Sequence, residues 1–166
     1  MNQQTRVSRT ARLIMALVFC FTAPTLARAA QKIDACALLT RAEIQAVLNQ
    51  NVGEGKINPN SNPAVGAPCG YTIGAGGVFS ILAKTTNPGE TAAKVMAELK
   101  KRKIPVSEAP GIGDRSFFSS PGYGMVQLNT FKGGHYLIIT MLLPGTSEAA
   151  QKAAAGKLMS KALKKI

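Results

Sequence analysis

The spacing of hydrophobic residues changes between two periods along the chain. Apolar residues that alternate with polar ones, or run together over four to eight positions, predict strands, and recurrence every three or four positions predicts helices. Strands are predicted at 69–73, 78–84, 115–119, 125–131 and 135–142, and 51–57 is left open as one more. Helices are predicted at 41–49, from Asn87 to just before Pro105, and at 146–165.

Capping residues indicate where two of these helices begin. Thr40 and Glu43 have the spacing of a capping box, in which each side chain accepts a hydrogen bond from the other residue's backbone amide. Asn87 is predicted as the N-cap of the second helix, with Pro88 at its first position and Glu90 at its third. The predicted buried faces are Ala92, Val95, Met96 and Leu99 in the second helix, and Ala155, Leu158, Met159, Ala162 and Ile166 in the last.

Glycine turns predict how the strands pair. Gly133 and Gly134 suit a two-residue type I′ turn, which fixes the register of the strands on either side. This register sets Phe131 opposite Tyr136, Leu128 opposite Ile139 and Val126 opposite Met141. The order of elements predicts an α+β fold, a mostly antiparallel sheet of five to six strands packed by two to three helices. The second and third helices are expected on the same face of this sheet.

The first 29 residues have the pattern of a signal peptide. Three arginines precede an apolar run from Leu13 to Leu26, and Ala27 and Ala29 form a cleavage site before Ala30. The run is too short for a stable membrane span. Residues 1–29 are therefore predicted to be a leader, and residues 30–166 a single exported domain.

The leader favours the general secretory route and a periplasmic or secreted location. Its arginines are not adjacent, which argues against the twin-arginine route. Lipid anchoring is disfavoured because Cys20 follows the bulky Phe19, where acylation requires a small residue.

Composition narrows the class of protein further. The 166 residues are 46% hydrophobic and 17% charged, which excludes a disordered chain. The net charge of +12 becomes +8 after removal of the leader, since four basic and no acidic residues precede Ala30. A strongly basic exported domain is expected to meet anionic partners, and its location argues against nucleic acid.

Two cysteines, Cys36 and Cys69, remain after processing. In an oxidising compartment they have one intrachain pairing, and a structural disulfide is the favoured interpretation. A redox pair is the alternative. It is disfavoured because the spacing is not C-x-x-C and no His or basic residue flanks either thiol.

Little in the sequence indicates catalysis. The one histidine, His135, stands beside a turn and is expected opposite Lys132, without a partner that would orient a base. A copper site of His135, Met125 and Met141 is disfavoured because the register puts Met125 on the other face. No catalytic residue, metal site or cofactor is predicted.

Three further segments carry weaker hypotheses. The turn from Pro110 to Asp114 is interpreted as structural, with Gly111 and Gly113 as permissive positions, Ile112 directed into the core and Asp114 capping its own turn. The long segment from Gly53 to Pro68 is either a variable connection or a functional loop. The candidate binding residues are four lysines of the last helix, Lys157, Lys161, Lys164 and Lys165.

Several short motifs occur together in a fixed order: the segment Asp34–Thr40 followed by Glu43, Cys69-Gly70-Tyr71, Gly111–Asp114 and the Gly133-Gly134 hairpin. In these the chain resembles domain-of-unknown-function family 3558, over nearly the whole mature domain. The resemblance implies a small secreted or lipid-anchored bacterial protein with a cysteine pair and no established catalytic activity. The chain departs from that family in lacking a lipobox.

Three functions are compatible with the sequence. The leading hypothesis is a non-catalytic cell-envelope binding or interaction module whose basic surface contacts an anionic envelope component. The second is a carrier of a small apolar ligand in a pocket between sheet and helices, suggested by the small residues Ala153, Ala154, Ala155 and Gly156. The third is an enzyme.

Overall fold

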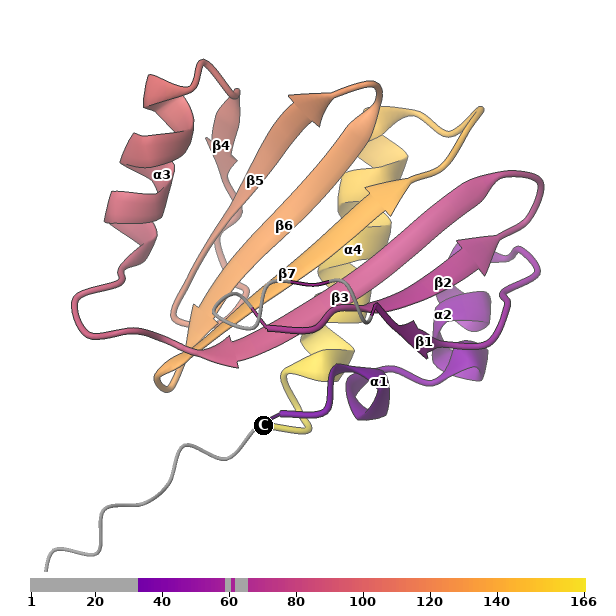
Figure 1. Cartoon of the computed structure of the whole chain (residues 1–166). Helices are drawn as coiled ribbons and strands as arrows, with labels where there is room; N and C mark the ends of the chain where they lie inside the picture. Colours follow the sequence, from indigo (N-terminus) through magenta and orange to yellow (C-terminus); the bar gives the residue numbers. More distant parts are fainter. Residues whose placement is uncertain (1–32, 59–60, 62–65) are drawn as a thin grey trace, which may run out of the picture.

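The computed structural model describes residues 33–58, 61 and 66–166. The predicted leader and its cleavage site lie outside the described residues. In chain order (Figure 1) the elements are α1 (Ala35–Leu38), α2 (Arg41–Leu48), β1 (Lys56–Ile57), β2 (Cys69–Ile73), β3 (Gly77–Thr85), α3 (Ala92–Lys101), β4 (Val106–Glu108), β5 (Arg115–Gly122), β6 (Met125–Lys132), β7 (His135–Leu142) and α4 (Glu148–Ala162).

The strands form one antiparallel sheet in the order β1-β2-β3-β7-β6-β5-β4. The predicted α+β class is confirmed, with seven strands where five to six were expected. The difference lies at the edges, because β4 was not predicted and β1 is a two-residue strand within the segment expected to be a loop or a strand. Strands of two and three residues are too short to show a hydrophobic period, and short edge strands also protect a sheet against pairing with other chains.

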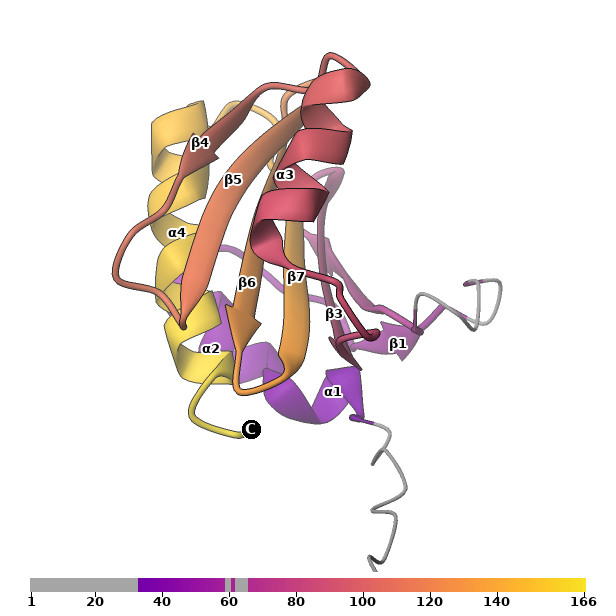
Figure 2. The same ribbon diagram turned by 90° about the vertical axis from the view of Figure 1, so that its left-hand side faces the viewer.

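Helices cover both faces of the sheet. Figure 2 shows α4, α1 and α2 on one side, here called the back face, and α3 on the other, the front face. Two separate apolar clusters match these layers, a large one at the back around Leu128, Ile139 and Leu158, and a small one at the front around Phe117 and Tyr136. The expectation that the second and third predicted helices share a face is therefore wrong. Side chains of successive strand residues point to opposite faces, so a strand that is apolar at nearly every position can bury both.

The hairpin prediction is confirmed in detail. Gly133 and Gly134 have φ of 53° and 81°, as a type I′ turn requires. All three predicted cross-strand pairs of β6 and β7 occur. A shift by one residue would exchange the buried faces, so this turn decides which residues face α4 and which face α3.

One helix start is confirmed and the other is wrong. Thr40 and Glu43 form the predicted capping box of α2. The helix predicted from Asn87 begins instead at Ala92, with Thr91 as its N-cap. The cause is Gly89, whose φ of 74° is incompatible with a helix, so the preceding segment forms a separate turn.

The disulfide is present between Cys36 and Cys69, with the sulfur atoms 2.00 Å and the Cα atoms 5.1 Å apart. It joins α1 to β2 across the back of the sheet. A disulfide is consistent with an extracellular or periplasmic location. Within the described residues, no helix is long and apolar enough to span a bilayer.

Candidate functional site

Most of the front face beside α3 carries no helix of the described chain (Figure 1). One row of cross-strand neighbours on this face, which we call the polar row, takes one residue from each of six strands. It runs Lys56, Gly70, Ser80, Thr140, Gln127 and Ser119. Cross-strand neighbours on one face are within contact distance, so the register brings together residues that are far apart in the chain.

Hydrogen bonds connect the polar row to a buried tyrosine under α3. Tyr136 donates to Asn129 Oδ1 at 2.6 Å, and Asn129 donates to Ser119 Oγ at 3.1 Å. Ser119 donates to Gln127 Oε1 at 3.3 Å, and Gln127 Nε2 donates to Thr140 Oγ1 at 3.2 Å. The chain of donors ends at Thr140, whose own hydroxyl hydrogen finds no acceptor within the described part of the molecule.

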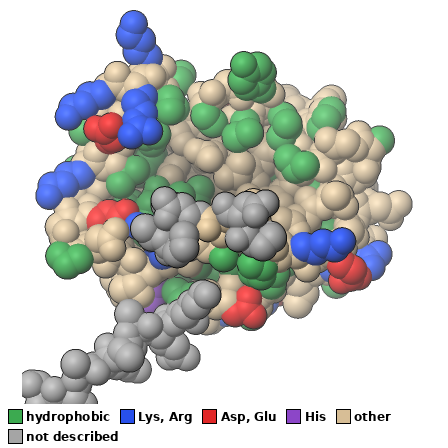
Figure 3. All heavy atoms as spheres, viewed as in Figure 1, with side chains coloured by type: hydrophobic (Ala, Val, Ile, Leu, Met, Phe, Trp, Pro, Cys, Tyr) green, Lys and Arg blue, Asp and Glu red, His purple; other side chains and the backbone are tan. Residues whose placement is uncertain are grey.

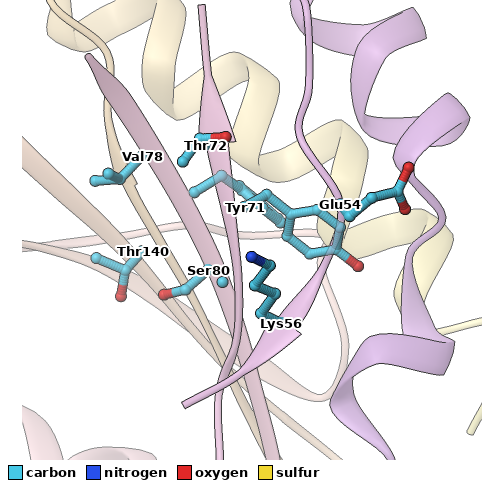
Figure 4. A pocket seen from close by; sticks show the side chains of 9 residues that line it. Glu54, Lys56, Tyr71, Thr72, Val78, Ser80 and Thr140 are labelled. Atoms are coloured by element: carbon cyan, nitrogen blue, oxygen red, sulfur yellow. The ribbon is translucent and has the colours of Figure 1, made fainter.

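At the β1 end of the polar row the surface is hollowed, with a volume of about 540 Å³. Its lining comprises Glu54, Lys56, Gly70, Tyr71, Thr72, Val78, Phe79, Ser80 and Thr140. Figure 4 shows these side chains on β1, β2, β3 and β7 and, for Glu54, on the segment that leads into β1. A hollow of this size lies within the usual range for small-molecule sites.

Apolar side chains border the polar row on one side. Val78 of β3 pairs with Leu142 of β7, and Thr72 of β2 pairs with Val78. Val78 is 44% exposed, and Leu142 is half-buried. In Figure 3, which views this face, Lys and Arg gather over α3, whereas hydrophobic and uncharged side chains cover much of the sheet beside it. The accessible lining of the hollow is therefore mostly apolar, and its polar groups include Lys56, Ser80 and Thr140.

The charge of the hollow is positive. Its one acidic residue, Glu54, accepts a hydrogen bond from Arg41 at 2.8 Å. Figure 4 shows the Glu54 carboxylate turned away from Ser80, and the ammonium end of Lys56 turned toward it. Lys56 forms no ion pair with any described carboxylate. Its charge is available to a ligand.

Tyr71 borders the hollow through its place in β2, but its side chain lies on the back face of the sheet. Its hydroxyl donates to the Leu39 carbonyl at 2.6 Å, and its ring packs against Phe79 with centroids 5.7 Å apart. Burial raises the pKa of Tyr71, so the phenol is neutral at physiological pH. The ring is therefore part of the back core.

The candidate lysines of the last helix do not form one group. Lys157, Lys161 and Lys164 are exposed on the outer side of α4 and its C-terminal turn. Lys165 instead pairs with Glu43 at 2.9 Å. Hydrogen bonds from the Thr40 backbone and from Lys165 lower the pKa of Glu43 to about 2, so this carboxylate holds the end of the chain against α2.

All eight acidic residues of the chain have local partners. Six carboxylates pair with Lys or Arg: Glu43, Glu54, Glu90, Glu98, Glu108 and Glu148. Asp34 caps α1, and Asp114 accepts from a backbone amide. Six lysines besides Lys56 have no carboxylate within ion-pair distance in the described ranges and no hydrogen-bonded partner for the ammonium: Lys94, Lys100, Lys103, Lys157, Lys161 and Lys164.

A largely buried ion pair between Lys84 and Glu90 lies beside Tyr136, under the segment that precedes α3. Lys84 and Glu90 lie 2.7 Å apart and are largely buried, and the Lys84 ammonium lies 5.6 Å from the centre of the Tyr136 ring. Burial raises the pKa of Glu90, but hydrogen bonds from Lys84 and from the Asn87 amide outweigh it, and the net shift is downward. Burial also raises the pKa of Tyr136. These groups fix the segment before α3 to the sheet.

The turn before β5 is hydrogen-bonded to the end of β6 and to the β6–β7 turn. Ile112 packs on the back core as predicted. Asp114 does not cap its own turn. Its Oδ2 accepts from the Gly133 amide of the β6–β7 turn at 2.8 Å, and its amide donates to the Phe131 carbonyl at 2.8 Å. The correction follows from register, because β5 pairs with β6 and brings Asp114 beside the turn that ends β6.

Two other features singled out in the sequence, His135 and the small residues of α4, lie at the back face. His135 lies opposite Lys132 as expected, and its Nδ1 is buried without a hydrogen-bond partner among the described residues. A Cβ on Gly156 would lie 3.4 Å from Ile112 Cδ1, so the small residues of α4 allow close packing there. Among the described residues, no group of three His, Cys, Asp or Glu is arranged to hold a metal.

Comparison of the chain with family models, with curated proteins and with solved structures finds no match. The resemblance to domain-of-unknown-function family 3558 stays a prediction.

The sequence interpretation missed the hollow. Lys56 lies in the segment from Gly53 to Pro68, for which the sequence allows a functional loop but indicates no particular residue. Ser80 and Thr140 have the sequence context of ordinary strand positions. The available signal was polar residues within otherwise apolar strands, which indicates a face that is not fully covered.

Proposed function

We propose that the protein is a non-catalytic binding module of the cell envelope, exported by the general secretory route, whose cationic surface associates with an anionic partner. The observation that carries this proposal is the distribution of charge. Every carboxylate has a local partner, whereas six exposed or half-exposed lysines outside the hollow have no carboxylate partner in the described structure. The net positive charge is therefore left for a partner outside the domain.

The lysines of α4 and its C-terminal turn form a regularly spaced part of this surface. Lys157, Lys161 and Lys164 are spaced by four and three residues and so project from one side of the helix over about 10 Å. The apolar side of α4 is buried against the sheet, with Leu158 and Met159 fully enclosed. This helix cannot insert into a bilayer, so its contact with a partner is electrostatic and is weakened by salt.

Co-sedimentation with lipid vesicles tests the proposal. The mature oxidised protein is expected to bind vesicles that contain phosphatidylglycerol and not vesicles of phosphatidylcholine alone, and binding is expected to fall as salt rises. The triple change Lys157→Gln, Lys161→Gln and Lys164→Gln should abolish most of this binding.

A matched control removes the same charge elsewhere. Lys94→Gln, Lys100→Gln and Lys103→Gln act on α3 and its C-terminal turn, on the other side of the sheet. Equal losses from the two triple variants would show that only net charge matters and that α4 is no binding surface. Absence of binding by the unchanged protein to vesicles and to an anionic polysaccharide would contradict the proposal itself.

A further inference from the structure

The hollow on the front face has one end suited to an anion. Lys56 supplies a charge with no described carboxylate partner, and Ser80 and Thr140 face each other across β3 and β7 as further donors. Gln127 already occupies an acceptor site of Thr140, which leaves the Thr140 hydroxyl hydrogen free to donate. One ammonium and two hydroxyls match a group with a single negative charge and two acceptor oxygens.

Gly70 opens the space between these donors. It lies between Lys56 and Ser80 in the polar row and contributes no side chain. A Cβ added there would come no closer than 3.8 Å to any neighbouring atom, which is the Lys56 carbonyl oxygen. The gap is therefore open on the front face and does not result from close backbone packing.

The border of the hollow is suited to an alkyl chain. Val78 is 44% exposed, an unusual fraction for a valine in an interior strand, and its cross-strand neighbour Leu142 is half-buried. Contact with an alkyl chain would remove apolar surface from water without any movement of the sheet.

We infer that this hollow binds a long-chain fatty acid, with its carboxylate at Lys56 and its alkyl chain along Val78 and Leu142. The single positive charge fits a monoanion. Tyr71, the one tyrosine that lines the hollow, is only 5% exposed, so the hollow offers no flat aromatic surface on which a sugar ring would stack. The site is on the face opposite α4 and is independent of the lysines in the proposed function.

Calorimetric titration of the mature oxidised protein with palmitate tests the inference. Palmitate is expected to bind as a monomer, and the alcohol of the same chain length more weakly, because it lacks the charge. Lys56→Gln should weaken palmitate binding about tenfold, as expected for loss of one charge-assisted hydrogen bond, and should leave the alcohol unaffected. Gly70→Val should weaken both ligands, because its side chain would occupy the gap.

Lys101→Gln is the matched control, since it removes an equal charge from the exposed end of α3, outside both proposed sites, and should leave palmitate binding unchanged. Thermal unfolding of each variant establishes that the fold is retained. Three results would overturn the inference: no binding of palmitate by the unchanged protein, equal affinity for palmitate and the alcohol, or an unchanged palmitate affinity in Lys56→Gln. None of these results bears on vesicle binding by α4, so the two proposals fail separately.

Discussion

The glycines of the turn before β5 allow a test of how the two hairpins are held together. Both have positive φ, 83° at Gly111 and 61° at Gly113, so alanine at either position adopts a left-handed conformation that costs about 1 kcal/mol. They differ in their surroundings. An added Cβ on Gly111 meets nothing within 4 Å, whereas on Gly113 it would lie 2.7 Å from both Phe131 O and Thr130 Cγ2.

The overlap at Gly113 forces a movement of the backbone. To relieve it, the turn must move away from β6, and this stretches the two hydrogen bonds that join Asp114 to Phe131 and Gly133, each 2.8 Å long. Each bond contributes about 1 kcal/mol. We therefore expect Gly113→Ala to lower the free energy of unfolding by about 3 kcal/mol, and Gly111→Ala by about 1 kcal/mol.

Equilibrium unfolding in urea measures both values, with equal m-values as the condition for comparing them. Asp114→Asn serves as a further variant, because the amide oxygen still accepts from Gly133 while the charge is lost, and it should cost less than Asp114→Ala. If the two alanine variants at the glycines were equally stable, the contact with Phe131 would be irrelevant and the turn would need only permissive dihedral angles.

Three other predictions follow from the described contacts. Replacing both Cys36 and Cys69 by alanine should lower stability to urea by about 4 kcal/mol, because the disulfide closes a loop with a sequence separation of 33; a loss below about 1 kcal/mol would contradict this. Glu43 has a folded pKa of about 2 against a usual 4.5, so its contribution is complete above pH 4.5 and is lost as pH falls toward 2. Between pH 4.5 and 2, the free energy of unfolding of Glu43→Gln should fall by about 1 kcal/mol less than that of the unchanged protein, allowing for solvent screening. Urea unfolding at several pH values measures this, and the same pH dependence in both proteins would refute it. Mass spectrometry of the exported protein should give a chain that starts at Ala30 without lipid, whereas an acylated Cys20 would contradict the leader assignment.

Local signals in the sequence predicted much of the fold because the structure uses them locally. The capping box of α2 involves residues three apart, and the β6–β7 register depends on a two-residue turn. Each is determined within a few positions of the chain, where steric and hydrogen-bonding rules leave few choices. The same reasoning found the cysteine pair, since only two cysteines follow the predicted leader.

Competing local signals explain the misplaced helix start. Asn87, Pro88 and Glu90 have the types expected of the first helical turn, and the Glu90 side chain does accept from the Asn87 amide at 2.9 Å. That hydrogen bond closes a turn outside the helix. The decisive residue is Gly89, at φ 74°, after which Thr91 provides a second capping side chain.

The assignment of helices to faces needed information that the local pattern lacks. β7 is apolar at most positions and none of its residues is fully exposed, so its sequence shows that both faces are at least partly covered without showing which helix covers each. The register supplies the answer. Tyr136 and Ile138 face α3 with Phe117 and Phe131, and the alternate residues Leu137 and Ile139 face α4.

The hollow depends on register to a greater degree than any other feature. Lys56, Gly70, Ser80 and Thr140 come from four strands, and 84 positions separate the first from the last in the numbering of the chain. Each is an ordinary residue in its own segment, and none forms part of a motif. Their chemistry arises from three successive pairings, β1 with β2, β2 with β3 and β3 with β7. A shift of one residue in any of these pairings would move Lys56 or the hydroxyls to the opposite face, where the disulfide and the apolar core already lie. The same packing that fixes the back core therefore holds the donors of the front face together, and substitutions in the back core that change the register should abolish palmitate binding without touching the hollow.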